Sequence, residues 1–213
     1  MIRVYLYIIQ IYIKLTLRIY FGIIPLVKNI PRLIKEGDKM KNTTKQICIT
    51  AMGVALFVAL TLCVQVPVFQ NYYLCLGYFV MTAFCYIVGT TSGTIVGTMG
   101  VVIYCMVTGG LRGMPGWALG NLVIGIILGL TFKLTRKIKK PIIEIVISTA
   151  VAVFSVALGI LVIKSLVEHV IYTLPFTLRV MTNIYAFVAD VVIIVISIPI
   201  CKAIEPKIKS MIK

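Results

Sequence analysis

Six long apolar runs follow Met40, and the short segments between them hold most of the charged residues. The runs are approximately Ile47–Val66, Leu74–Val88, Gly93–Thr108, Trp117–Phe132, Ile142–Ile163 and Val180–Cys201. A helix needs about 20 apolar residues, within a range of about 17–25, to cross the hydrocarbon core of a bilayer. With 61% hydrophobic and only 13% charged residues, the chain is too apolar for a water-soluble domain. The runs predict an all-α membrane protein, a six-transmembrane-helix bundle in the cell membrane.

The basic residues predict the orientation of this bundle. If the N-terminus is cytoplasmic, eleven Lys and Arg residues lie in cytoplasmic segments, against Arg112, Lys164 and Arg179 outside. Because segments rich in Lys and Arg stay on the cytoplasmic side of the membrane, we expect both termini there. The net charge of +15 does not indicate nucleic-acid binding, since no basic face interleaves with aromatic residues.

Residues 1–39 do not fit the pattern of the rest of the chain. Their apolar stretch is interrupted by Lys14 and Arg18 and followed by two prolines, so they could form an interfacial amphipathic helix or a seventh span. We favour a third interpretation, in which 1–39 is a non-native upstream extension and the domain is 40–213. The segment Glu36–Met40 can be encoded by a purine-rich, ribosome-binding-like string before an ATG. N-terminal sequencing of native protein that found residues before Met40 would refute this.

Small residues recur on one face of the first run. Ala51, Ala55 and Ala59 are spaced by four, which places them on the same side of a helix. Small residues at this spacing let a second helix approach closely within a lipid bilayer. Either a partner protein or another helix of the same bundle could occupy this face.

Polar residues form a stripe on the last run. Arg179, Asn183 and Asp190 are spaced i, i+4 and i+11, on one helical face, and the stripe descends about 16 Å from the outer surface. A carboxylate at the depth of Asp190 must be paired, protonated or hydrated. A hydrogen bond to Asn121 or Thr182 would be a purely structural role for it.

Further polar and aromatic residues belong to the outer halves of the second, third and fourth runs. They are Tyr72, Tyr73, Tyr104, Arg112, Trp117 and Asn121. Trp117 and Asn121 are one helical turn apart and share a face. An apolar and aromatic lining with a few placed polar groups is what a small-molecule site requires. With Arg179 and Asn183, these residues make up the predicted substrate-binding set.

Catalysis and metal binding have little support in the sequence. The six cysteines include no CxxC pair, so we expect no metal site. The single histidine, His169, falls beside Glu168 in a predicted outer loop, and Glu144 is expected to make a local ion pair near a basic loop. No GxSxG, HExxH or Walker A motif occurs. We therefore predict a protein that is not an enzyme and needs no cofactor.

A series of glycines extends through the middle of the chain. It includes Leu76-Gly77-Tyr78, Val88-Gly89, Ser92-Gly93, Val96-Gly97 and Gly100, then Gly109-Gly110-Leu111-Arg112-Gly113, Trp117, Gly120, Gly125 and Gly129. Together with the six-span layout and the alanine face, this series resembles the substrate-binding S component of energy-coupling factor (ECF) vitamin transporters. The likeness covers essentially Lys41 to Lys213.

The resemblance implies a division of labour among subunits. An S component captures a vitamin or vitamin precursor from outside, joins a transmembrane T component and two ATPase subunits, and topples in the membrane to release its cargo. In that family the AxxxA face contacts the T component, a role that would fall to Ala51, Ala55 and Ala59. The pocket lies in the outer half, beneath the first outer loop, here around Val66–Tyr73, and the loop before the last span.

The resemblance leaves the cargo open. Trp117, Tyr72, Tyr73 and Tyr104 suit stacking on a flat heteroaromatic ring such as a flavin or a pyrimidine, and we favour this interpretation. Alternatively, Arg112 or Arg179 suits a carboxylate such as that of pantothenate. The main competing function is a self-sufficient ion-coupled secondary transporter or channel that uses Asp190 as its relay, although no inverted repeat is evident. An intramembrane enzyme and a scaffold are the remaining classes.

Overall fold

The computed structural model describes the backbone of residues 42–69, 72–138 and 140–212. The segment 1–39 and the proposed start at Met40 lie outside these residues, so both stay predictions. The chain divides into two compact units, Met1–Ile49 with Lys207–Lys213, and Thr50–Pro206. The side-chain contacts described below lie in the second unit.

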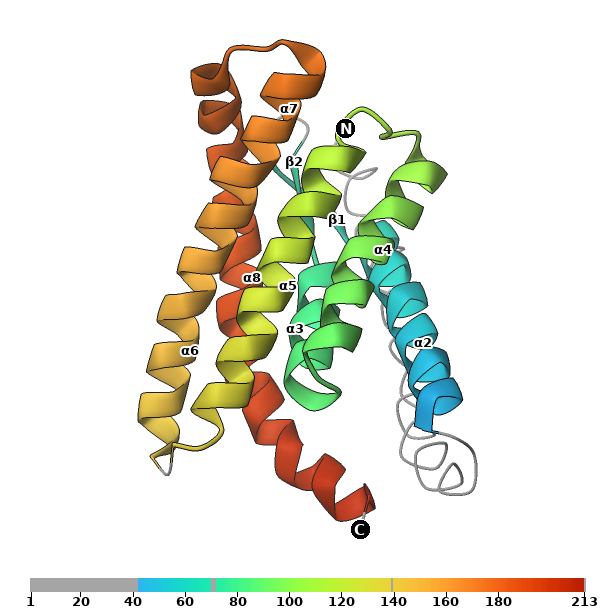
Figure 1. The fold of residues 1–213 in the computed structure, drawn as a ribbon, viewed down its shortest axis with the longest axis vertical. Helices are drawn as coiled ribbons and strands as arrows, with labels where there is room; N and C mark the ends of the chain where they lie inside the picture. The colour runs from blue at the N-terminus through green and yellow to red at the C-terminus, as the bar shows by residue number, and fades with distance from the viewer. Residues whose placement is uncertain (1–41, 70–71, 139, 213) are drawn as a thin grey trace, which may run out of the picture. The chain divides into compact units, whose positions relative to one another are not determined.

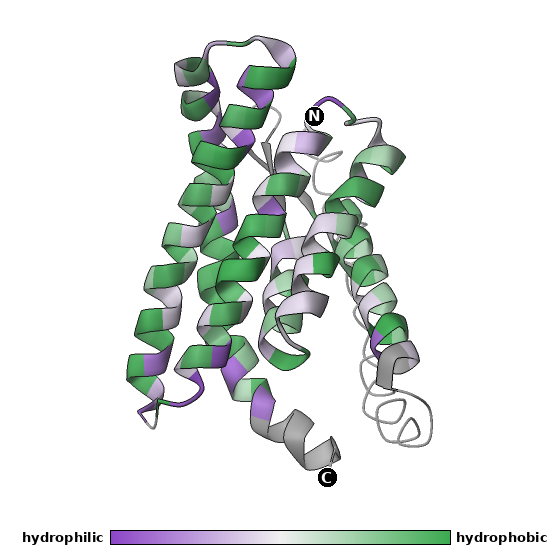
Figure 2. Cartoon of the chain, viewed as in Figure 1, coloured by the Kyte–Doolittle hydropathy of each residue, from purple (hydrophilic) through white to green (hydrophobic). Residues whose placement is uncertain are grey.

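The described elements are mostly helices. In chain order they are α2 (Asn42–Cys63), β1 (Gln65–Phe69), β2 (Tyr72–Cys75), α3 (Gly77–Ile87), α4 (Thr90–Thr108), α5 (Met114–Thr135), α6 (Pro141–Val156), the π-helix η2 (Ala157–Lys164), α7 (Ser165–Tyr172) and α8 (Phe176–Ile212) (Figure 1). Five helical segments are long and apolar enough to cross a membrane, and Gly77–Ile87 is a shorter apolar helix. One of the five, Pro141–Tyr172, comprises α6, η2 and α7. Apolar residues extend along these helices, and strongly hydrophilic residues concentrate toward helix ends (Figure 2).

Each predicted span corresponds to a helix in the structure, with differences at the boundaries. The first run was predicted to end at Val66, but α2 ends at Cys63 and Val66 belongs to β1. The second run was predicted from Leu74, but its first residues form β2, which pairs antiparallel with β1 in the register Gln65↔Cys75 and Val66↔Leu74. The predicted first outer loop is therefore a β-hairpin. The fifth run was predicted to end at Ile163, but its helix continues to Tyr172. The cytoplasmic location of both termini stays a prediction.

Helix α5 is the centre of the unit, because it contacts α3, α4, α6, η2 and α7. Glycines on α5 permit these contacts. A Cβ atom on Gly129 would lie 2.5 Å from the Cα atom of Thr90 on α4, and one on Gly120 would lie 2.7 Å from the carbonyl oxygen of Gly159 on η2. The glycine series of the sequence thus marks helix crossings. Between α3 and α4, which are separated by only two residues, Gly89 adopts a φ of 129°, a conformation that favours glycine.

We expect Gly120→Ala to destabilise the protein by about 1–3 kcal/mol, because the new methyl group meets a backbone carbonyl that cannot move independently of η2. The matched control is Gly110→Ala, whose new Cβ atom would be 3.5 Å from its nearest neighbour, the Thr108 hydroxyl oxygen. Thermal melting of both variants in detergent checks this. Equal melting temperatures for the two would contradict the assigned α5–η2 crossing.

Glu144, at the start of α6, forms the ion pair that was predicted for it. Its partner is Lys202 on α8, not a residue of the nearby basic loop. The hydroxyl of the buried Tyr86 lies 3.2 Å from Glu144 Oε1 and 2.7 Å from Glu205 Oε2. Arg136 pairs with Glu205 at 3.9 Å. These contacts join the ends of α3, α5, α6 and α8.

Candidate ligand-binding site

Tyr78 connects two residues of the predicted site. This side chain at the start of α3 is fully buried. Its hydroxyl donates a hydrogen bond to Asn121 Oδ1 at 2.6 Å and accepts one from Trp117 Nε1 at 2.9 Å. Asn121 Nδ2 donates to the carbonyl oxygen of Gly97 at 3.1 Å. The phenol hydroxyl therefore both donates and accepts a hydrogen bond. These two bonds hold the side chains of Tyr78, Trp117 and Asn121 in place.

The ring of Tyr104 extends this group. It packs edge-on against the ring of Trp117, with centroids 5.7 Å apart and an interplanar angle of 81°. We call Tyr78, Tyr104, Trp117 and Asn121 the aromatic cluster. The structure therefore brings together three predicted site residues from α4 and α5. Tyr78 was not among the predicted site residues, although it lies in the glycine series quoted above.

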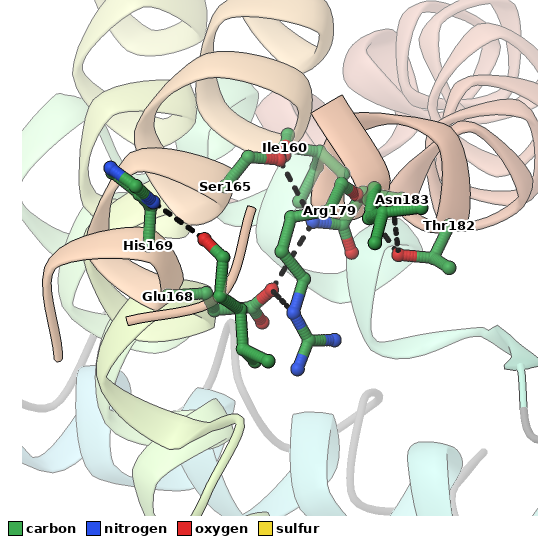
Figure 3. Close-up of polar contacts among 9 residues, drawn as sticks. Ile160, Ser165, Glu168, His169, Arg179, Thr182 and Asn183 are labelled. Atoms are coloured by element: carbon green, nitrogen blue, oxygen red, sulfur yellow. Dashed lines mark hydrogen bonds and ion pairs between the residues drawn. The ribbon is translucent and has the colours of Figure 1, made fainter. Parts of the chain in front are cut away.

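A second group lies where α7 and α8 face each other, and we call it the charged cluster (Figure 3). It consists of Ser165, Glu168, Arg179 and Asn183. Asn183 Nδ2 donates to Ser165 Oγ at 2.9 Å and to Glu168 Oε2 at 3.4 Å. Arg179 Nε lies 3.7 Å from Glu168 Oε2. The buried Glu168 carboxylate thus contacts both the Arg179 guanidinium and the Asn183 amide on α8.

Asn183 has one unused hydrogen-bonding function. Its side chain is 1% exposed, and its amide oxygen has no hydrogen-bond partner among the residues that the structure describes. A buried polar atom without a partner costs about 1–3 kcal/mol. Such an atom in a polar cluster indicates a position that a ligand donor can fill.

Lys164 and Asp190 link the two clusters. Asp190 is 5% exposed, and its carboxyl group lies near enough to the Tyr78 hydroxyl and to Lys164 for both to act on it electrostatically. Lys164 interacts in turn with Glu168. The structural partners expected for Asp190 were wrong: Asn121 bonds to Tyr78, and the exposed Thr182 bonds to carbonyls of its own helix.

The remaining predicted residues lie at the edge of this arrangement. Arg112, on the exposed α4–α5 connection, places its guanidinium carbon 5.2 Å from the ring centroid of Tyr172 at the end of α7. Tyr72 and Tyr73 belong to β2 of the hairpin, and their side chains lie outside the described residues. The structure therefore does not test the contribution of these two rings.

The sequence-based assignment of Glu168 and His169 to a loop was wrong. Both belong to α7, which follows the π-helix Ala157–Lys164 without interruption. π-Helical turns inside α-helices are frequent at functional sites. Here η2 ends at Lys164 and leads directly into the helix that carries Ser165 and Glu168. Glu168 is 5% exposed, so a residue predicted to be solvated is buried in the site.

The alanine face of α2 points away from the interior of its unit. Ala51 and Ala55 are exposed and Ala59 is half-buried, whereas Gly53 and Phe57 on the same helix are buried. The possibility that this face packs inside the bundle is thus not supported at Ala51 and Ala55. Its contact with a partner stays a proposal.

Comparison with known protein families identifies the chain. A model of the family described as the S component of the ECF-type riboflavin transporter matches residues 41–206. The chain belongs to this family. It is therefore a multi-pass membrane protein and the substrate-binding subunit type of an ECF transporter, and membership does not favour the ion-coupled alternative. No curated protein and no solved structure matches the chain.

Proposed function

We propose that this S component captures riboflavin from outside the cell and delivers it to an ATP-driven uptake transporter. The observation that carries the proposal is the buried amide oxygen of Asn183 in the charged cluster, which has no hydrogen-bond partner among the residues that the structure describes. The family to which the chain belongs is that of the riboflavin transporter S component.

The chemistry of riboflavin suits the side chains at this site. Its ring system is flat and aromatic, and its pyrimidine edge presents one N–H donor between two carbonyl acceptors. The Asn183 oxygen can accept from that donor. Tyr104 and Trp117 offer aromatic surface of the kind on which such rings pack. A ligand N–H would satisfy the buried Asn183 oxygen, which lacks a partner among the described residues.

The carboxylate alternative has less support in the arrangement. A ligand carboxylate would need an available guanidinium, since Arg pairs with such groups through charge-assisted hydrogen bonds. Arg179 is paired with Glu168, and Arg112 lies over the ring of Tyr172. Pantothenate would therefore meet a guanidinium whose charge Glu168 already balances, or one that lies on the exposed α4–α5 connection.

The hairpin is the proposed cover of the site. It connects α2 to α3, and α3 begins with Gly77 and the buried Tyr78. A two-stranded hairpin is only marginally stable by itself, so it can move away from the helices without unfolding them. Movement of β2 would carry Tyr72 and Tyr73 toward or away from the ligand, while the Cα of Tyr78 remains within the helical part of the unit.

The proposed partners are a transmembrane T component and two ATPase subunits. The exposed positions Ala51 and Ala55 are the proposed contact with the T component, because small side chains allow helix axes to approach to about 8–10 Å. Residues 40–213 form the proposed functional domain, and 1–39 the proposed upstream extension.

Reconstitution tests the proposed function as a whole. The chain is placed in liposomes with or without a T component and two ATPase subunits of an ECF transporter, and uptake of labelled riboflavin is measured with and without enclosed ATP. We expect uptake only when both the partners and ATP are present. Uptake by the chain alone, driven by an ion gradient and abolished in Asp190→Asn, would establish the ion-coupled alternative instead.

A further inference from the structure

Positive and negative charges are balanced around the candidate site. Lys164 and Arg179 contribute two positive charges, and Glu168 and Asp190 contribute two negative charges. Arg179 pairs with Glu168 at 3.7 Å, and the charge of Lys164 acts on both Glu168 and Asp190, so neighbouring charges alternate in sign. In their ordinary ionised forms, these four side chains carry no net charge.

Glu168 has the central position in this balance. Its side chain is 7% exposed, whereas that of Arg179 is 28% exposed. The same carboxylate oxygen, Oε2, lies 3.7 Å from Arg179 Nε and 3.4 Å from Asn183 Nδ2. Glu168 therefore neutralises the guanidinium and also orients the amide whose oxygen is available to a ligand (Figure 3).

We propose that Glu168 is a specificity-determining residue that neutralises Arg179 and thereby restricts the site to uncharged flavins. This inference rests on the proposed function, and it concerns the discrimination of riboflavin from flavins that carry an anionic side chain, such as the 5′-phosphate. Without Glu168, Arg179 would present a guanidinium of the kind that pairs with phosphate oxygens.

Stability alone does not account for this arrangement. A buried ion pair contributes little net free energy of folding, because the cost of desolvating both charges offsets their attraction. A phosphate brought to the cluster, however, would meet a guanidinium whose charge Glu168 already balances, so it would gain less than from an unpaired arginine. The ion pair is thus better suited to selecting a ligand than to stabilising the helices.

The test compares riboflavin and flavin mononucleotide on the purified protein, using the quenching of flavin fluorescence to obtain both dissociation constants. We expect Glu168→Gln to strengthen flavin mononucleotide binding relative to riboflavin binding about tenfold, equivalent to about 1.4 kcal/mol, whether or not riboflavin binding itself changes. Adding Arg179→Gln to this variant should return the ratio of the two constants toward the wild-type value. Glu144→Gln, which removes a buried carboxylate near the other ends of these helices, is the matched control and should leave the ratio unchanged.

The outcomes separate this inference from the proposed function. An unchanged ratio in Glu168→Gln, or an equal change in Glu144→Gln, would overturn the role of Glu168 even if riboflavin binds tightly. Wild-type protein that fails to bind riboflavin would instead refute the proposed function. If Glu168→Gln does not fold, Arg179→Gln is the deciding variant. It leaves the Glu168 carboxylate without its positive partner, so it should weaken the binding of flavin mononucleotide more than the binding of riboflavin. Any other change in the ratio of the two constants would overturn the inference.

Discussion

Replacing Asn183 with alanine is expected to weaken riboflavin binding about ten- to a hundredfold while leaving the thermal stability of the unliganded protein nearly unchanged. The loss of affinity corresponds to about 1–3 kcal/mol, the cost of leaving a ligand donor unpaired in a buried site. In the unliganded protein, the substitution removes two hydrogen bonds to Ser165 and Glu168, but it also removes the unpartnered amide oxygen. These opposite effects on the free energy of unfolding should largely cancel. Isothermal titration calorimetry and thermal melting measure the two quantities.

The adjacent Thr182→Ala variant is the matched control for Asn183→Ala. Thr182 is exposed, and its hydroxyl donates only to carbonyl oxygens of its own helix, those of Leu178 and Arg179. Its removal should change neither the dissociation constant nor the melting temperature measurably. If Asn183→Ala lowered the melting temperature strongly and left the affinity intact, Asn183 would be a packing residue and not a ligand contact.

Placing a tryptophan at Ala55 is expected to reduce ATP-driven uptake at least tenfold and to leave riboflavin affinity within about threefold. The bulky ring would separate helix axes that must approach to about 8–10 Å for close packing. Ala55 is exposed on the described unit, so the ring displaces no buried neighbour within it. Uptake by the reconstituted transporter and riboflavin titration of the isolated subunit give the two values.

Ala150→Trp provides the comparison for Ala55→Trp. Ala150 is an exposed alanine on α6, a helix that the proposal does not assign to any partner. The same ring placed there should leave both uptake and affinity near the wild-type values. Equal loss of uptake in the two variants would show that any added bulk impairs the protein. Loss of riboflavin affinity in Ala55→Trp would place the alanine face in the ligand site instead.

The helices and part of the site could be predicted because they follow from periodicity. The apolar runs located every long helix. The i, i+4 spacing of Trp117 and Asn121 predicted that they share a helical face, and in the structure both bond to the hydroxyl of Tyr78. The same argument placed Arg179 and Asn183 together, and both lie against Glu168. Local spacing on one helix is visible in a sequence.

The partners of these residues, Tyr78 and Glu168, could not be predicted from spacing on one helix. Tyr78 lies within an apolar run, where its hydroxyl gives no distinctive pattern. Glu168 was expected in a loop because charged residues usually end a span, yet its pairing with Arg179 allows the helix to continue to Tyr172. The π-helical turn before it depends on packing against α5, where Gly120 meets Gly159. The hairpin depends on pairing between segments that each lack a strong strand pattern.

Calorimetric titration of the purified chain with riboflavin tests the central claim most directly. The account predicts saturable binding of about one riboflavin per chain, with an affinity that Asn183→Ala weakens and Thr182→Ala preserves. Pantothenate, which would require a guanidinium that is already paired, should give no heat of binding under the same conditions. Saturable binding of pantothenate without any binding of riboflavin would contradict both the proposed cargo and the proposed role of the charged cluster.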